Sequence, residues 1–79
     1  MKPIRLTRHA KNRMRWRRVA EEEVTKVLGA PEWTESTRFG RMNAFAEVEG
    51  RLIKVTYVDE EDALIVISVL ATERGGAVT

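Results

Sequence analysis

The spacing of apolar residues changes at Pro31, and this change constrains the fold more than any other feature of the sequence. Before Pro31, apolar residues recur three and four positions apart, which is the helical spacing. After it they follow the alternation of strands, in segments rich in valine, isoleucine, threonine and aromatic residues. A chain of 79 residues has room for one small hydrophobic core. The sequence therefore predicts a single α+β domain with its helices first and its strands last.

The first predicted helix spans residues 8–18. Thr7 precedes it and is a residue type that favours the N-cap position. Leu6, Ala10 and Met14 fall on one narrow apolar line at the helical period, so this line is expected to face the core. The remaining positions are mostly basic and are expected to face outward.

The second predicted helix begins after Ala20. Glu23 is its third residue, where a glutamate can accept a hydrogen bond from the N-cap backbone. Three successive glutamates in the first turn also suit the helix dipole. Gly29 and Pro31 end the helix, because proline cannot continue it.

Four strands are predicted after Pro31, at residues 33–39, 44–49, 51–58 and 64–71. Their short connections join antiparallel neighbours. Residues 2–6 are expected to be extended, with Pro3 limiting their pairing. The predicted architecture is two N-terminal helices packed on one face of a four-stranded antiparallel β-meander. It occupies residues 1–71, and residues 72–79 are expected to form a flexible tail.

The second face of the predicted sheet lacks a cover. The fourth strand is apolar on both faces, and two helices on one side cannot bury both. A partner subunit, including a second copy of the chain, or a ligand is therefore expected there. In the second strand, Phe45 competes with Ala44, Ala46 and Val48 for the core. Trp33 and Phe39 are both expected to be core residues.

Composition excludes several classes of site. The chain has no cysteine, which excludes disulfides and thiolate metal sites, and a single histidine argues against structural zinc. We expect no metal and no cofactor. The basic N-terminus is not followed by an apolar signal segment, and the longest apolar run is too short to span a membrane as a helix. A cytoplasmic protein without membrane contact is expected.

Positive charge is concentrated at the start of the chain. Residues 1–20 contain eight lysines and arginines and no acid, whereas residues 21–79 contain six basic and twelve acidic side chains. A local excess of this kind is typical of proteins with an anionic partner such as nucleic acid. The alternative is that a surface helix simply carries solvated arginines.

His9, Arg13 and Arg17 recur every four residues along one edge of the first helix. Cleavage of RNA by its 2′-hydroxyl needs a base, which His9 can supply, and positive charge on the phosphate, which the two arginines can supply. Lys54 can assist from the sheet, or it can face solvent on the open side.

A structural role for the same residues is equally consistent with the sequence. His9 can bond to a nearby backbone group, and the two arginines can form ion pairs with acidic residues at 21–23 or with Glu47. Further candidates for nucleic-acid binding lie on the same helix: Arg8, Lys11, Arg15, Trp16 and Arg18. Trp16 can stack on a base or cover the end of the core, and the second role is favoured.

Two consecutive motifs resemble a known family. They are Leu-Thr-x-His-Ala-x-x-Arg-Met-x-x-Arg, starting at Leu6, and Glu-Glu-Val-x-x-Val-Leu-x-x-Pro, ending at Pro31. They resemble a small bacterial domain family of unknown function that is grouped with the RelE/ParE-like toxin fold and the barnase–EndoU–colicin–RelE nucleases. Its signature falls on His9, Ala10, Arg13, Met14 and Arg17. At the helix break the family's usual Gly-Ile-Ser is Arg-Val-Ala here, and Ser68-Val69-Leu70 replaces a final Thr-Val-Tyr segment.

The resemblance implies a toxin-type protein that acts on RNA or the ribosome. A metal-independent endoribonuclease activity is one activity that it implies, and an antitoxin-like protein is the partner that would mask it. Two other classes of function stay open. One is a non-catalytic nucleic-acid-binding module, and the other is an interaction domain that dimerises or binds a partner through its open sheet face.

Overall fold

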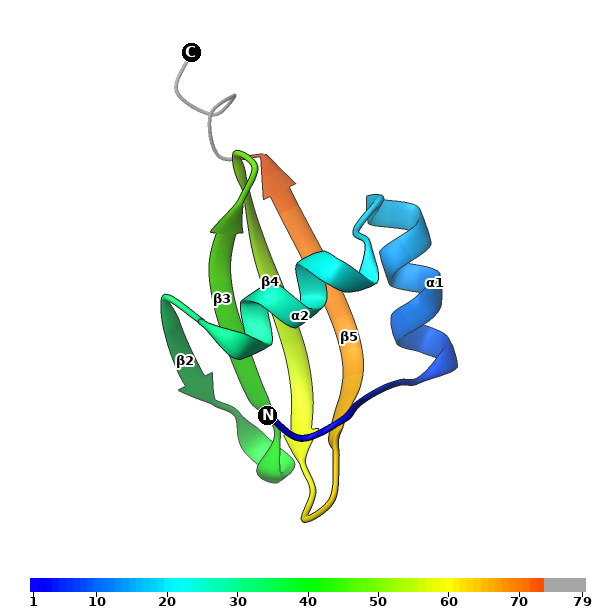
Figure 1. Ribbon diagram of the computed structural model, residues 1–79, viewed down its shortest axis with the longest axis vertical. Coiled ribbons are helices and arrows are strands. Elements are labelled where there is room, and N and C mark those ends of the chain that lie inside the picture. Colours follow the sequence, from blue (N-terminus) through cyan, green and yellow to red (C-terminus); the bar gives the residue numbers. More distant parts are fainter. Residues whose placement is uncertain (74–79) are drawn as a thin grey trace.

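The computed structural model describes residues 1–73 of the chain. It contains two helices and a sheet, and both helices lie on the same face of that sheet (Figure 1). The elements in chain order are β1 (Ile4–Leu6), α1 (Arg8–Arg17), α2 (Glu21–Gly29), β2 (Trp33–Ser36), the 3₁₀ turn η1 (Arg38–Gly40), β3 (Met42–Val48), β4 (Arg51–Asp59) and β5 (Leu64–Glu73). The predicted α+β class and the order of helices before the main strands are confirmed.

The sheet has five strands in the order β1-β5-β4-β3-β2 and is mixed. β2 to β5 form the predicted antiparallel meander, but β1 adds to its edge in parallel with β5, so the four-stranded prediction was wrong. Pro3 precedes this strand and does not prevent pairing, because its carbonyl oxygen accepts a hydrogen bond from the Leu64 amide at 2.9 Å. A strand of three residues is too short to be recognised by alternation.

Thr7 joins the first strand to the first helix. Its hydroxyl accepts a hydrogen bond from the Ala10 amide at 3.1 Å, which confirms the predicted N-cap. Its own amide and hydroxyl donate to the carbonyl oxygen of Val66 at 3.1 and 3.0 Å. The start of α1 is therefore fixed to β5.

α1 ends at Arg17, one residue before its predicted end. Arg18 takes a left-handed conformation with φ 54°, where glycine is the usual residue. The Val19 amide donates to the Met14 carbonyl at 2.9 Å, and the Arg18 amide donates to the Arg15 carbonyl at 3.3 Å. This pair of bonds is a Schellman motif, and it turns the chain sharply toward α2 without a glycine.

The hydrophobic core lies between the two helices and the sheet. Its members are almost completely removed from solvent: Ala10, Met14, Val19, Val24, Val27, Ala44, Ala46, Val48, Ile53, Val55, Val66 and Val69. In β3 the alanines and Val48 face the helices, which places Phe45 on the opposite face by alternation. Trp33 pairs with Phe45 in register, and their rings stack with centroids 4.6 Å apart. The expectation that Trp33 is a core residue was wrong, because it lies on the open face and is 40% exposed.

β5 contains an irregularity that the alternation did not predict. Thr56 pairs with Ser68 and Tyr57 pairs with Val66, so Ile67 is an extra residue on β5. This bulge lets Val66 and Val69 both face the helices, although strict alternation assigns them to opposite faces.

The chain between β2 and β3 also differs from the prediction. The strand ends at Ser36, which pairs with Met42, and the intervening residues form a turn. Phe39 lies in this turn with φ 65° and is 90% exposed, so the expectation of a core phenylalanine was wrong. The turn closes through a 2.8 Å hydrogen bond from the Thr37 amide to the Arg41 carbonyl, which directs Phe39 outward.

β5 continues through Thr72 and Glu73, two residues that were predicted to belong to the flexible tail. The rest of that tail, residues 74–79, lies outside the described residues. Along the described part of the chain, neither helix has the length and apolar character that crossing a membrane requires.

The sheet face opposite the helices is covered by no element within residues 1–73 (Figure 1). By alternation from the buried positions, Phe45, Val58, Ile65 and Leu70 lie on this face, and all four are partly exposed.

Candidate functional site

α1 presents a strongly basic outer surface. Its two buried residues, Ala10 and Met14, face the core. The other helical positions and the C-cap residue are exposed. They include six basic residues: Arg8, Lys11, Arg13, Arg15, Arg17 and Arg18. No acidic residue occurs in the first turn of this helix. The predicted orientation of the basic helix is therefore the one observed.

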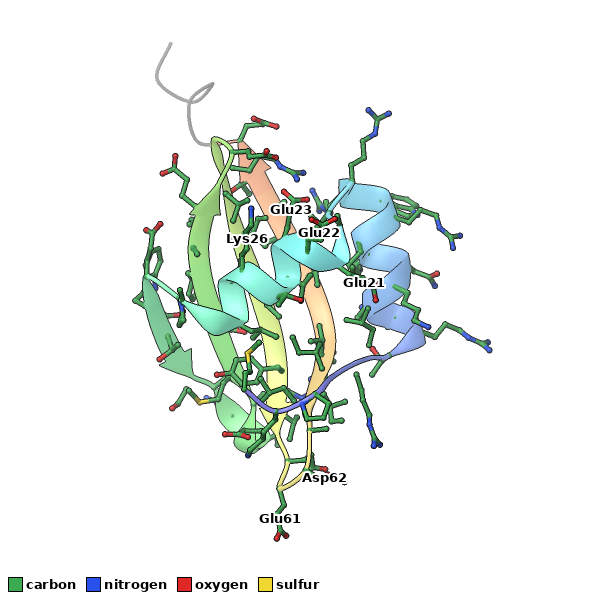
Figure 2. All side chains as sticks on the ribbon, in the orientation of Figure 1. Glu21, Glu22, Glu23, Lys26, Glu61 and Asp62 are labelled. Atoms are coloured by element: carbon green, nitrogen blue, oxygen red, sulfur yellow. The ribbon has the colours of Figure 1, made fainter. Side chains whose placement is uncertain are left out.

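Ion pairs within residues 1–73 do not involve this surface. They join Lys2 to Asp59 at 2.6 Å and Arg51 to Glu23 at 3.0 Å. Glu23 was one of the acids proposed as a structural partner for the arginines of α1, and its carboxylate instead pairs with Arg51. Figure 2 shows the acidic residues that it labels at the start of α2 and in the β4–β5 turn rather than on α1.

His9 and Arg13 are in contact. The Nε of Arg13 donates to Nε2 of His9 at 3.4 Å, across one turn of the helix. The imidazole and the guanidinium group therefore lie side by side on the exposed surface of α1. Arg17 follows one turn later on the same line of the helix.

A shallow cleft of about 300 Å³ lies beside this pair, lined by His9, Asn12, Arg13 and Trp16. Trp16 is 81% exposed, so the favoured expectation that it covers the end of the core was wrong. Trp16 is exposed because it lies two positions after the buried Met14. Two positions correspond to a rotation of about 200° around the helix, which turns the indole away from the core. The indole is therefore available at the surface.

Lys54 lies apart from these residues. Its neighbours Ile53 and Val55 are completely buried against the helices, so alternation places Lys54 on the opposite face of the sheet. Its cross-strand partners there are Phe45 and Leu70. The structure brings together His9 and Arg13 but does not bring Lys54 to them.

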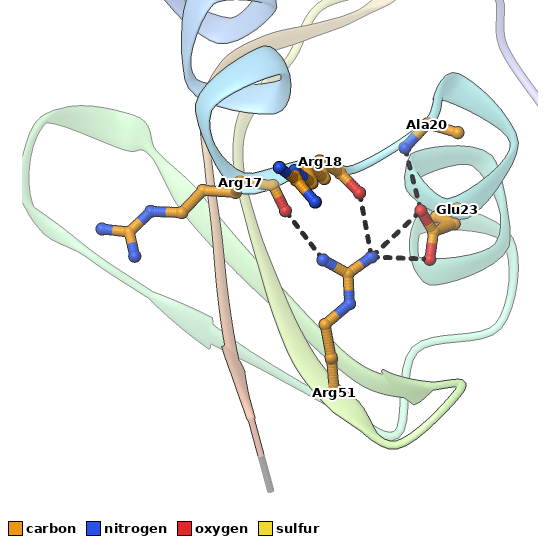
Figure 3. A network of polar contacts seen from close by, with 5 residues as sticks. All are labelled: Arg17, Arg18, Ala20, Glu23 and Arg51. Carbon is orange, nitrogen blue, oxygen red and sulfur yellow. Dashed lines mark hydrogen bonds and ion pairs between the residues drawn. The ribbon is translucent and has the colours of Figure 1, made fainter.

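A polar network at the end of α1 was not predicted (Figure 3). The guanidinium group of Arg51 donates to the carbonyl oxygens of Arg17 and Arg18 at 2.7 and 3.1 Å. It also donates to both carboxylate oxygens of Glu23. One side chain from β4 thus holds the end of α1 and the beginning of α2.

Glu23 completes the network. Its Oε1 accepts a hydrogen bond from the Ala20 amide at 2.9 Å, which is the acidic half of a capping box, as the sequence indicated. This bond lowers the pKa of the Glu23 carboxyl group, and the nearby Arg51 lowers it further, whereas burial acts in the opposite direction. The capping pattern predicted the role of Glu23, whereas no pattern pointed to Arg51, which lies 28 residues further along the chain.

Among the described residues, no group of three or more histidine, cysteine, aspartate or glutamate side chains is placed to hold a metal ion. The candidate site is the cleft on α1, where the basic side chain of Arg13 lies beside His9, Asn12 and Trp16.

Comparison with known proteins gives one family. A family model described as a domain of unknown function, DUF4258, matches residues 6–71. No curated protein and no solved structure matches the chain. The family match covers most of the chain, including both helices and nearly all of the sheet. The chain therefore belongs to the DUF4258 family.

Proposed function

We propose that this protein is a toxin-type protein that acts on RNA and binds it in single-stranded form along the exposed face of α1. The observation that carries the proposal is the exposed Trp16 indole, which shares a cleft with Arg13 on a helix whose cations lie outside the ion pairs of residues 1–73. Cations that bind phosphates and an aromatic ring that stacks on a base are the two components of single-strand recognition.

Two further points support RNA. Stacking on an indole requires an unstacked base, which favours single strands and loops over duplexes. The His9 to Arg17 motif also resembles that of a small bacterial domain family that is grouped with the RelE/ParE-like toxin fold and with the barnase–EndoU–colicin–RelE nucleases.

Binding of a fluorescein-labelled single-stranded RNA should be strongly dependent on salt. Replacing Arg13 with glutamine removes one phosphate contact and should reduce the slope of log K against log salt by about 0.7. Trp16→Ala should weaken binding by about 1–3 kcal/mol, the usual contribution of one stacked base. Fluorescence anisotropy across a salt series measures both effects.

Trp33→Phe is the matched control, because Trp33 is the other tryptophan of the chain and stacks on Phe45 in the sheet. It should bind RNA as the wild type does. Equal affinities for Trp16→Ala, Trp33→Phe and the wild type would contradict a site on α1.

The contact between His9 and Arg13 favours ribonuclease activity as a second candidate. In its neutral form His9 can accept the proton of a 2′-hydroxyl through Nε2, once Arg13 has turned from that nitrogen to the phosphate, while the hydroxyl oxygen attacks the adjacent phosphorus. Arg13, and Arg17 one turn further, can stabilise the negative charge that develops on the phosphate oxygens. The bond to the 5′-oxygen then breaks, and a proton from solvent completes the leaving hydroxyl.

His9→Ala should abolish cleavage of RNA and leave its binding largely intact, because the phosphate and stacking contacts remain. Gel analysis of a labelled RNA, with the same sequence as DNA for the substrate control, measures this. DNA should remain intact because it lacks the 2′-hydroxyl. Cleavage of RNA at the same rate by the wild type and by His9→Ala would show that His9 is not the base.

A further inference from the structure

We infer that the cleft beside Trp16 accepts one unpaired base of the RNA and that the Asn12 side-chain amide reads the hydrogen-bonding edge of that base. The inference rests on the proposed function, and it adds a sequence preference that phosphate contacts alone cannot produce.

The first support is the position of Asn12. It lines the same cleft as Trp16, one helical turn before it, and His9 lies three residues earlier on the same wall. A base that stacks on the exposed indole therefore enters the cleft that the Asn12 side chain also lines.

The second support is the state of the neighbouring polar groups. Within residues 1–73 the Asn12 side chain makes no hydrogen bond, so its carbonyl oxygen and its two N–H donors remain available. The Nε2 of His9 is already occupied by Arg13, and the guanidinium group of Arg13 is a donor only. Asn12 is thus the group of the cleft that offers a donor and an acceptor side by side, which is the pattern that an adenine edge complements.

Replacing the Asn12 amide with a carboxylate should change which base the cleft prefers. An aspartate at this position has two acceptor oxygens and no donor. Guanine displays two adjacent donors, N1–H and N2–H, whereas the exocyclic amine of adenine stands beside an acceptor. Asn12→Asp should therefore disfavour adenine strongly and guanine much less.

The experiment compares oligouridines that contain one central adenosine or one central guanosine, measured by fluorescence anisotropy at constant salt. Lys11→Gln is the matched control, because it changes the net charge by the same amount as Asn12→Asp at an exposed position of α1 outside the cleft. Lys11→Gln should weaken binding of both oligonucleotides by the same factor. Asn12→Asp should change the adenosine-to-guanosine affinity ratio by about 10-fold or more in favour of guanosine. Asn12→Ala should bring the ratio close to one.

If Asn12→Asp weakens binding of both oligonucleotides equally, as Lys11→Gln does, the inference is overturned while the proposed function stands. If the wild type binds neither oligonucleotide, both are overturned. A ratio that changes in Asn12→Asp but not in Lys11→Gln assigns base recognition to Asn12.

Discussion

Replacing Arg51 with methionine is expected to destabilise the domain by about 3 kcal/mol, the usual cost of breaking a largely buried ion pair. The side chains of Arg51 and Glu23 are only 19% and 13% exposed. Methionine retains much of the volume but leaves the Glu23 carboxylate and the carbonyl oxygens of Arg17 and Arg18 without their donor. A core of this size rarely supplies more than about 3–5 kcal/mol, so the variant should keep a free energy of unfolding of only about 0–2 kcal/mol. Urea denaturation followed by circular dichroism measures the loss.

Glu23→Gln provides the control for this prediction. Glutamine can still accept the hydrogen bond from the Ala20 amide, so it preserves the cap while removing the charge. The double variant Arg51→Met with Glu23→Gln should therefore be more stable than Arg51→Met alone. If the two are equally destabilised, the loss does not arise from an unpaired carboxylate.

The pH dependence of the free energy of unfolding gives an independent check of the network formed by Arg51 and Glu23. The pKa of Glu23 is lower in the folded protein than in the unfolded chain, where the pKa of glutamate is about 4.3. Its ionised form therefore contributes stability above that pH, and the contribution disappears as the pH falls through the lower folded-state value. Arg51→Met should weaken this dependence, because one cause of the lowered pKa is removed.

Ile53→Ala should destabilise the domain by about 3–4 kcal/mol, whereas Ile53→Val should cost only about 1 kcal/mol. Ile53 is completely buried at the centre of the sheet and is among the largest fully buried side chains. Truncation to alanine removes several buried carbon atoms and leaves a cavity between the sheet and the helices. Differential scanning calorimetry of the two variants measures the difference.

Leu52→Ala is the comparison on the opposite face, where Leu52 is only partly buried. Leu52→Ala should lower the free energy of unfolding clearly less than Ile53→Ala does. A loss as large as that of Ile53→Ala would indicate that the open face of the sheet is covered in solution, for example by a second copy of the chain.

The sequence predicted the elements that are long enough for the spacing of their apolar residues to be recognised. Thr7 and the apolar line of α1 defined the first helix to within one residue, and the predicted strand at 51–58 corresponds to β4. It could not predict β1, because three residues carry no measurable period. It could not predict the bulge at Ile67 either, since a single inserted residue reverses the faces only after the point of insertion.

The candidate site was predicted to a similar degree. Helical spacing placed His9 and Arg13 on one line, and the structure shows them in contact. Trp16 was expected to cover the end of the core, but its angle around the helix places it at the surface. Lys54 was expected either to assist from the sheet or to face solvent on the open side, and the pleat of β4 places it on the open side. The Arg51 network joins residues from three elements, so no local pattern reveals it.

α1 is attached to the rest of the molecule at both ends. Thr7 bonds its beginning to β5, and Arg51 bonds its end to β4 and α2. A helix held in this way presents its charges as a preorganised array, so the RNA binding proposed above would require little additional ordering of the backbone. Loosening either attachment should therefore weaken binding through lost rigidity, even though neither Thr7 nor Arg51 needs to touch the ligand.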